Sequence, residues 1–290
     1  MVTTFRKLLN FCEEELKQAG VQDADWDAWL ILEHCFGLSR SSYFLKRDLE
    51  QELPLDAVSE LKRLTKERSR RIPLQYLFGT QEFMGLPFLV NEAVLIPRSD
   101  TENLVEAVLS DWDGKQETCS VLDVCTGSGC IAAALAYYGR FAAVDAVDLS
   151  EAALKVAEQN AETNRVKVRF MQGDLFEPVT DRYDIIVSNP PYITDDVIRT
   201  LEPEVKDHEP YMALSGGADG LIFYRRLASE SKNCLKPGGS IYLEIGYDQA
   251  EAVSGILLEN GFEHIRVRKD LAGNDRVVSA DLKKGGIQHV

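Results

Sequence analysis

The sequence predicts an α/β protein: a doubly wound, mostly parallel sheet of seven strands, preceded by a small all-helical domain at the N-terminus. From about residue 96 onward, short apolar segments alternate with segments of helical periodicity. This pattern is typical of a parallel sheet with helices on both faces. Residues 1–78 carry only the helical spacing of apolar side chains. Residues 79–95 mix Phe and Val with Gly, Pro and Asn, which predicts a hairpin connector between domains at 1–78 and 96–290.

Three helices are expected in the N-terminal domain. The first covers about residues 5–16, the second runs from 25 to 36 and ends at Gly37, and the third begins near Pro54. The third helix is expected to bury four apolar side chains, Leu55, Val58, Leu61 and Leu64. Its other face is basic, with Lys62, Arg63, Lys66, Arg68, Arg70 and Arg71. We interpret this face as a solvated helix surface, with a partner-binding surface as the alternative.

The α/β region is divided by seven short apolar segments. We expect strands at residues 120–124, 142–147, 166–171, 185–188, 240–245, 264–268 and 276–281. The clearest helices are expected at residues 130–138, 151–162 and 248–260. In a doubly wound sheet the ligand binds at the carboxyl ends of the central strands, so the functional residues should follow those strands.

The charge of the chain is strongly negative and unevenly divided. Asp and Glu number 47 and Lys and Arg number 32, which gives a formal net charge of −15. Residues 1–78 hold 12 basic and 13 acidic residues, so nearly all of the excess acidity belongs to the α/β region. Proteins that bind nucleic acid usually present a positive surface to the phosphates. The charge therefore argues against a nucleic acid partner.

The cysteines and the hydropathy exclude further classes of protein. None of the six cysteines forms a C-x-x-C pair, and six are few for a disulfide scaffold of 290 residues. We therefore expect reduced thiols in a cytoplasmic protein and no metal site. No apolar run approaches the roughly 18–20 residues of a membrane span, which predicts no membrane partner.

A glycine turn joins the first expected strand to the helix that follows it. The sequence of this turn is Asp123-Val124-Cys125-Thr126-Gly127-Ser128-Gly129-Cys130-Ile131. Gly127 and Gly129 let the backbone approach a ligand closely. Asp148 ends the next strand, where an acid can accept hydrogen bonds from ribose hydroxyls. The pattern predicts a cofactor that contains a nucleoside. An NAD site stays open, because Ala132 completes a relaxed dinucleotide fingerprint, and so does a turn without a ligand.

A second loop belongs to the same edge of the sheet. Gly173-Asp174-Leu175-Phe176 follows the third expected strand. The Asp174 carboxylate and a backbone amide there can bind the edge of an adenine ring. The alternative is an acid that only caps the next turn.

The most informative motif is Asn189-Pro190-Pro191-Tyr192, directly after the apolar strand 185–188. Two consecutive prolines fix the backbone and remove two N–H donors, which leaves carbonyl acceptors. The Asn189 side-chain oxygen and the Pro190 carbonyl can bind the two hydrogens of a planar NH₂ group, and Tyr192 can stack on its plane. Such a site would align a delocalised nitrogen lone pair with an electrophilic methyl group, by positioning and electrostatics alone.

With these motifs the chain resembles the class I S-adenosylmethionine-dependent methyltransferases, and within them the release factor glutamine methyltransferases. The resemblance covers nearly the whole chain. It is carried by residues 95–102, the glycine turn, residues 146–148, 173–176, 189–193 and 273–276. A short helical N-terminal domain and a hairpin connector also fit this family, as does a Rossmann-like sheet of seven strands.

The resemblance implies a role for each motif. It places the cofactor S-adenosylmethionine, with S-adenosylhomocysteine as the product, on Cys125, Thr126, Gly127, Ser128, Gly129, Asp148, Asp174, Leu175 and Asn189. It places the substrate amide on Asn189, Pro190, Pro191 and Tyr192, with Asn189, Pro190 and Tyr192 as the catalytic group. The implied substrate is the glutamine of the Gly-Gly-Gln motif in class-1 peptide chain release factors, with the helical domain recognising that protein.

One position departs from the family pattern. Many members have glycine where this chain has Cys125, so the path of the first turn residue is in question. A redox-sensitive thiol is one interpretation of Cys125, and a small buried residue is the one we favour.

Several other functions share part of this pattern. An adenine exocyclic-amine methyltransferase of DNA or RNA also uses Asn-Pro-Pro-Tyr, but the net charge of −15 and the lack of a basic recognition domain argue against it. A glutamine methyltransferase of a ribosomal protein is a second alternative. An NAD(P)-binding oxidoreductase lacks an evident acid or base for hydride transfer, and a non-catalytic cofactor-binding protein would not need the Asn189–Tyr192 motif.

Acidic residues are dense around the Asn-Pro-Pro-Tyr motif. Residues 177–209 contain nine acidic and three basic side chains. Electrostatic steering of a basic partner is one interpretation, and a solvated loop is the other.

Overall fold

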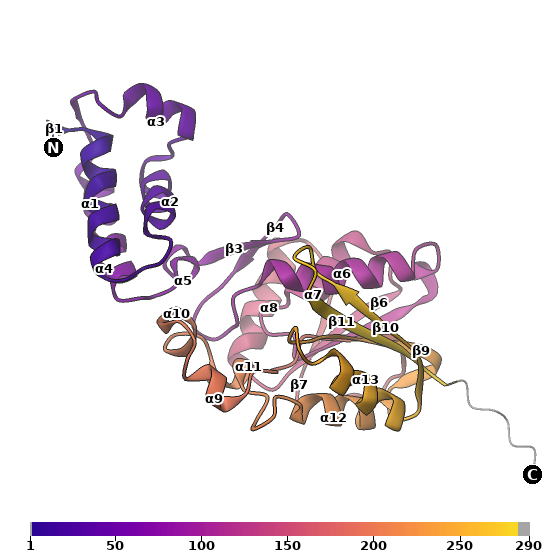
Figure 1. The fold of residues 1–290 in the computed structure, drawn as a ribbon. Coiled ribbons are helices and arrows are strands. Elements are labelled where there is room, and N and C mark those ends of the chain that lie inside the picture. The colour runs from indigo at the N-terminus through magenta and orange to yellow at the C-terminus, as the bar shows by residue number, and fades with distance from the viewer. Residues whose placement is uncertain (1, 284–290) are drawn as a thin grey trace, which may run out of the picture. The chain divides into compact units, whose positions relative to one another are not determined.

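The computed structural model describes residues 2–283, which divide into two compact units (Figure 1). One unit comprises the chain up to Phe78 together with Glu202–His208. The other comprises Gly79–Leu201 and the chain from Glu209 onward. A short segment from the second half of the sequence therefore packs into the helical unit, which the sequence does not indicate.

The helical unit is built from five helices around one apolar core. These are α1 (Phe5–Gln18), α2 (Ala24–Phe36), α3 (Arg40–Lys46), α4 (Leu55–Ser69) and α5 (Leu74–Phe78). The Thr4 side chain caps α1 by accepting a hydrogen bond from the Lys7 amide, and Gly37 ends α2 in the left-handed region. The α10 helix (Pro203–Lys206) lies in the segment that joins this unit.

Three helices are expected in the helical unit and five are present, because α3 and α5, of seven and five residues, are too short for a clear periodicity. Two further expectations are wrong. The unit is not purely helical, because β1 (Val2–Thr3) pairs antiparallel with β2 (Gln51–Glu52). Strands of two residues are too short to show periodicity in the sequence. Leu55 is not buried: it is the first residue of α4, directly after Pro54, and is 67% exposed. The other three apolar residues expected to face inward on this helix are buried.

The basic face of α4 is not uniformly solvated. Arg68 is buried, with a side chain only 8% exposed, and its Nε lies 2.7 Å from Asp27 Oδ2. Its Nη2 lies 2.8 Å from Glu204 Oε1, and Arg71 Nη2 lies 2.6 Å from Glu204 Oε2. These two arginines therefore bind the segment around α10 and are not available to a partner protein. Arg63 pairs with Glu60 on the exposed surface, as a solvated face would predict.

The second unit contains a hairpin and a seven-stranded sheet. The hairpin pairs β3 (Thr80–Phe83) with β4 (Leu86–Leu89). The strands of the sheet are β5 (Ser120–Val124), β6 (Ala143–Asp148), β7 (Arg169–Gln172), β8 (Tyr183–Ser188), β9 (Leu235–Glu244), β10 (Phe262–Lys269) and β11 (Asp275–Leu282). Their order is β10-β11-β9-β8-β5-β6-β7, and the five strands from β7 to β9 are parallel. β11 runs antiparallel to both of its neighbours, β9 and β10. The prediction of a doubly wound, mostly parallel sheet of seven strands is confirmed.

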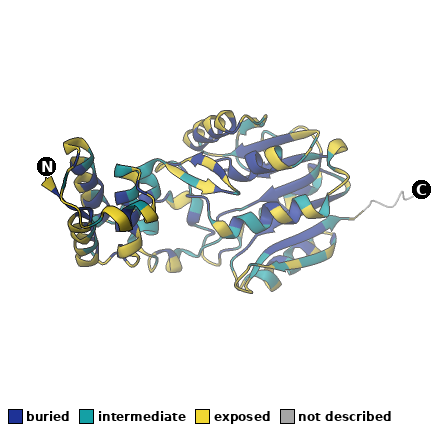
Figure 2. Cartoon of the chain, turned by 90° about the horizontal axis from the view of Figure 1, so that it is seen from above, coloured by how far each residue is buried: buried dark blue, intermediate teal, exposed yellow. Residues whose placement is uncertain are grey.

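Helices cover both faces of this sheet. They are α6 (Ser99–Asp111), α7 (Cys130–Tyr138), α8 (Glu151–Thr163), α12 (Ile222–Glu230) and α13 (Ala250–Glu259). Two short helices, α9 (Asp195–Ile198) and α11 (Tyr211–Leu214), lie in the segment between β8 and α12. Alternate residues of β5 enter opposite cores: Val121 packs with α6 and α7, and Leu122 with α12 and α13. Figure 2 shows the buried strands between helices whose outer faces are exposed. No helix among residues 2–283 is long and apolar enough to cross a membrane.

Candidate functional site

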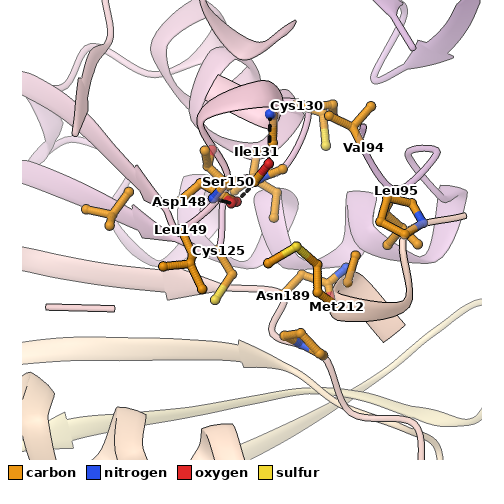
Figure 3. Close-up of a pocket in the computed structure, with 18 of the residues that line it drawn as sticks. Val94, Leu95, Cys125, Cys130, Ile131, Asp148, Leu149, Ser150, Asn189 and Met212 are labelled. Atoms are coloured by element: carbon orange, nitrogen blue, oxygen red, sulfur yellow. Dashed lines mark hydrogen bonds between the residues drawn. The ribbon is translucent and has the colours of Figure 1, made fainter. Parts of the chain in front are cut away.

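The candidate site is a cavity of about 130 Å³ at the carboxyl ends of the central strands (Figure 3). The register of the strands brings its walls together, because Val124 pairs with Val147 of β6 and with Ser188 of β8. The Ser188 hydroxyl donates to the Val124 carbonyl at 2.6 Å and ties the ends of β5 and β8. Strand order reverses between β5 and β8, and doubly wound proteins bind ligands at such a reversal.

Most of the predicted site residues line this cavity. They are Cys125, Thr126, Gly127, Ser128, Asp148, Asp174, Leu175, Asn189 and Pro191. Within the described part of the chain, Gly129, Pro190 and Tyr192 do not belong to the cavity wall.

The two glycines of the turn serve different purposes. Gly127 has φ +55°, and a Cβ built there would meet no atom within 4 Å, so its surface is open to a ligand. Gly129 has φ +77°, and a Cβ there would lie 2.8 Å from the Ala157 Cβ on α8. The backbone conformation therefore requires glycine at both positions. At Gly129, the close packing of the turn on α8 is a second reason.

Cys125 also adopts the left-handed region, with φ +63°. This conformation costs an L-residue roughly 1–2 kcal/mol, which gives a physical reason for glycine at this position in other members. Burial and the nearby Asp148 raise the pKa of the Cys125 thiol far above its usual value. A thiol that stays protonated is a poor nucleophile, which supports the packing role over the redox role.

Substitutions in the turn should separate these effects. Gly129→Ala is expected to lower the free energy of unfolding of the α/β unit by about 2–4 kcal/mol, because backbone strain adds to the clash with Ala157. Gly127→Ala should cost only about 1–2 kcal/mol, from strain alone. Cys125→Gly, the matched control, should change stability by no more than about 1 kcal/mol. Hydrogen exchange of peptides from α7 and α8 measures the loss of stability in each variant. Equal losses for Gly129→Ala and Gly127→Ala would contradict the different roles of the two glycines.

Asp148 is positioned to hold the turn and still accept a ligand. Its Oδ2 accepts a hydrogen bond from the Gly127 amide at 2.8 Å, and its Oδ1 accepts from the Ser150 amide at 2.9 Å. Burial raises the pKa of Asp148, and these amides oppose the rise. Each carboxylate oxygen accepts more than one hydrogen bond, so both keep capacity for hydroxyl groups in the cavity.

Asp174 has a partner that the sequence does not reveal. Arg226 Nη1 on α12 lies 2.9 Å from Asp174 Oδ1 and 3.0 Å from Oδ2. Leu175, the next residue, is buried and has φ +52°. The loop is therefore fixed by an ion pair and by an apolar anchor. An adenine-binding role for Asp174 and Leu175 stays a prediction.

Asn189 is held in one orientation at the end of β8. Its Nδ2 donates to the Thr101 hydroxyl on α6 at 3.2 Å. The amide NH₂ is thereby engaged with protein, and Oδ1 is the atom left for the cavity. An acceptor in this position is what the sequence motif predicts. Figure 3 shows Asn189 across the cavity from Asp148 and Leu149.

Tyr192 takes a different position from the expected rim of the site. Its ring is partly buried against the core between the sheet and α12 and α13. Its hydroxyl donates to Glu244 Oε1 at 3.4 Å. Burial and Glu244 raise the pKa of Tyr192, so the hydroxyl keeps its proton. Stacking of this ring on a substrate stays a prediction.

Four further polar residues shape the site but were not among the predicted ligands. Arg98 lines the cavity and pairs with the buried Glu209, and Thr101 lines it beside Asn189. Asp123 is fully buried, and its Oδ2 accepts from the Thr126 hydroxyl at 2.6 Å, which fixes the turn. Burial raises the pKa of Asp123 to about 7. In the sequence, Asp123 is marked only as an acid within the apolar strand segment 120–124.

The acidic segment 177–209 carries less free charge than its composition suggests. Six of its nine acids form ion pairs, namely Asp181, Asp184, Asp196, Glu202, Glu204 and Glu209. Paired charges produce a weaker field at a distance, so the structure favours the solvated-loop interpretation over steering.

Comparisons with known proteins show the domains and the family of this chain. A family model described as the PrmC N-terminal domain matches residues 7–79, and one described as the methyltransferase small domain matches residues 100–202. A methyltransferase structure from Pyrococcus furiosus has a TM-score of 0.55 at 20% identity, covering 75% of this chain and 99% of that chain. This likeness shows the fold.

Relatives of known name cover nearly the full chain. A release factor glutamine methyltransferase of Geobacter sulfurreducens is 41% identical over 97% of this chain and 98% of its own length. One of Clostridium acetobutylicum is 43% identical over 90% of this chain and 92% of its own. The resemblance drawn from the motifs is thus confirmed. The chain belongs to the release factor glutamine methyltransferase family.

Proposed function

We propose that this enzyme methylates the side-chain amide nitrogen of the glutamine in the Gly-Gly-Gln motif of class-1 peptide chain release factors. The methyl donor is S-adenosylmethionine, and the product is S-adenosylhomocysteine. The observation that carries the proposal is Asn189, whose oxygen is left free at the end of β8, in the same cavity as the glycine turn. The names of the full-length relatives supply the substrate. Release factors act in the cytoplasm, which is where we place this enzyme.

The cavity fits a nucleoside joined to an amino acid. Asp148 offers carboxylate oxygens to ribose hydroxyls, beside a turn whose Gly127 leaves open space. The loop at Asp174 and Leu175 lies on the same wall and offers a polar edge and an apolar surface to adenine. Leu149 and Phe223 add apolar lining for a planar ring.

The residues around Asn189 act by alignment. S-adenosylmethionine supplies a methyl group bonded to a positively charged sulfur. Asn189 Oδ1 would accept one hydrogen of the substrate amide, which would fix the nitrogen and turn its lone pair toward the methyl carbon. The motif offers the Pro190 carbonyl for the other hydrogen, although Pro190 does not line the cavity in this structure. The cofactor, held by the glycine turn and Asp148, would supply the methyl carbon, and the substrate nitrogen would exchange one proton, passed to solvent, for the methyl group. No covalent bond to the enzyme is needed.

A labelling experiment tests the proposal against its alternatives. The enzyme is incubated with methyl-labelled S-adenosylmethionine and, in separate reactions, with a purified class-1 release factor, ribosomal proteins, DNA and RNA. We expect label in the release factor, and none when its Gly-Gly-Gln glutamine is replaced by alanine. Label in nucleic acid or in a ribosomal protein, with none on that glutamine, would contradict the proposal.

A further inference from the structure

The chain that follows the Asn189–Tyr192 motif is hydrogen-bonded to the 214–220 loop, which leads from α11 to α12. The Ile193 amide donates to the Leu214 carbonyl at 3.0 Å, and the Gly216 amide donates to the Ile193 carbonyl at 2.8 Å. Both segments belong to the same α/β unit. The far end of the motif is therefore attached to a loop that has no role in the sequence motifs.

The side chain of Gln249, directly before α13, binds the motif and the loop together. Its Nε2 donates to the Tyr192 carbonyl at 3.1 Å and to the Gly220 carbonyl at 3.3 Å. Its Oε1 accepts from the Gly246 amide at 2.9 Å. The Gly246 N–H can only donate, so the oxygen must face it and the NH₂ must face the two carbonyls. Both hydrogens of the Gln249 amide are thus used on backbone acceptors.

Two buried glycines of the loop allow this close approach to the motif. A Cβ at Gly216 would lie 2.8 Å from the Tyr192 Cα. A Cβ at Gly220 would lie 2.5 Å from the Tyr192 carbonyl oxygen and 2.7 Å from Gln249 Nε2. A side chain at either position would therefore push against the last residue of the motif, so the loop is packed directly on the Tyr192 backbone.

We propose that Gln249 is a positioning residue, which with the 214–220 loop holds Tyr192 and thereby the whole Asn189–Tyr192 motif in place. The two prolines between Asn189 and Tyr192 restrict the backbone, so a fixed Tyr192 limits the movement of Asn189. In the described part of the chain the cavity wall does not include Gln249, so it acts through the motif and not on the ligands. The consequence for catalysis rests on the proposed function, whereas the hold on Tyr192 is a property of the protein alone.

Gln249→Met tests this role directly, because methionine keeps the length of glutamine and removes its amide. We expect kcat for release factor methylation to fall by roughly ten- to hundredfold, the scale of a small misplacement at a reacting centre, with the dissociation constant of S-adenosylhomocysteine within about twofold of wild type. Gln116→Met is the matched control. Gln116 also donates to a backbone carbonyl, that of Leu109 at 3.3 Å, and accepts from a backbone amide, that of Arg140 at 3.1 Å. It should leave kcat unchanged, and an unchanged kcat in Gln249→Met would overturn the proposal.

Gly220→Ala tests the same contact from the side of the loop. Its methyl group would displace the Tyr192 carbonyl or the Gln249 amide, so we expect a loss of kcat at least as large as in Gln249→Met. Gly217→Ala is the control, because Gly217 has φ +83°, close to the +72° of Gly220, but a Cβ there would lie 3.6 Å from its nearest neighbour, Ile222. This control has the backbone strain without the clash and should keep kcat within about twofold of wild type. Equal losses in the two alanine variants would show that strain in the loop is responsible, against the proposal.

Hydrogen exchange of the free enzyme separates this inference from the proposed function. Peptides that contain Ile193 and Gly216 report on the hydrogen bonds between the motif and the loop. We expect their amides to exchange roughly five- to tenfold faster in Gln249→Met and Gly220→Ala, the scale of one or two lost hydrogen bonds, and at the wild-type rate in the two control variants. Unchanged exchange in Gln249→Met would show that this side chain does not hold the motif, whatever the substrate is. Faster exchange, together with a wild-type enzyme that does not methylate release factors, would support the hold on Tyr192 and contradict the proposed function alone.

Discussion

Asn189→Ala is expected to lower kcat for release factor methylation by about 10²–10³-fold, the usual loss when one positioned polar group is removed from an active site. The loss arises because the substrate amide would lose the side-chain acceptor that lines the cavity, and its nitrogen would no longer be aligned. Steady-state rates with purified release factor measure the effect.

Cofactor binding should largely survive the same substitution. The other residues expected to bind it follow β5, β6 and β7 and do not depend on Asn189. Calorimetric titration with S-adenosylhomocysteine should therefore give a dissociation constant raised by less than about tenfold, a change of under about 1.4 kcal/mol. Near-normal turnover in Asn189→Ala would contradict the alignment mechanism. Loss of both turnover and cofactor binding would show a structural role instead.

Glu204→Gln is expected to destabilise the helical unit by about 3–5 kcal/mol, the cost of breaking a buried ion pair from one side. The Glu204 side chain is 16% exposed and receives both Arg68 and Arg71, while Arg68 also pairs with Asp27. Removing the central charge leaves two cations in a largely dry environment. Hydrogen exchange of peptides from α2 and α4 measures the loss for this unit separately.

A control variant and the pH dependence of stability both test the role of Glu204. Glu60→Gln breaks the exposed pair with Arg63 and should change stability by less than about 1 kcal/mol. Burial alone would raise the pKa of Glu204, but hydrogen bonds from Arg71 and Arg68 outweigh it and lower the pKa to about 2. Its contribution to stability is therefore complete above pH 4.5 and lost as the pH falls from about 4.5 to about 2. An equal loss of stability in Glu204→Gln and Glu60→Gln would contradict the stabilising role of the buried Glu204 ion pairs.

The sheet and the main motifs could be predicted because their signals are local. Alternating apolar segments predict strands and helices, and strand order in a doubly wound sheet places Gly127 and Asn189 at the same edge. Cys125 was recognised as a departure from the family pattern, and its φ of +63° now explains why glycine suits that position.

The contacts that could not be predicted join residues far apart in the chain. Arg68 meets Glu204, and Asp174 meets Arg226, across 136 and 52 positions of sequence. Neither periodicity nor a motif indicates such a pairing, because a charged residue in the sequence is equally compatible with a solvated surface position.

The most direct test of the central claim is to locate the methyl group on the product. A class-1 release factor is methylated by wild-type enzyme, and its peptides are fragmented by mass spectrometry. We predict one added methyl group on the side-chain amide nitrogen of the Gly-Gly-Gln glutamine, formed about 10²–10³-fold more slowly when Asn189→Ala replaces wild type. A methyl group on any other residue, or an unmodified glutamine after full turnover of S-adenosylmethionine, would contradict the account.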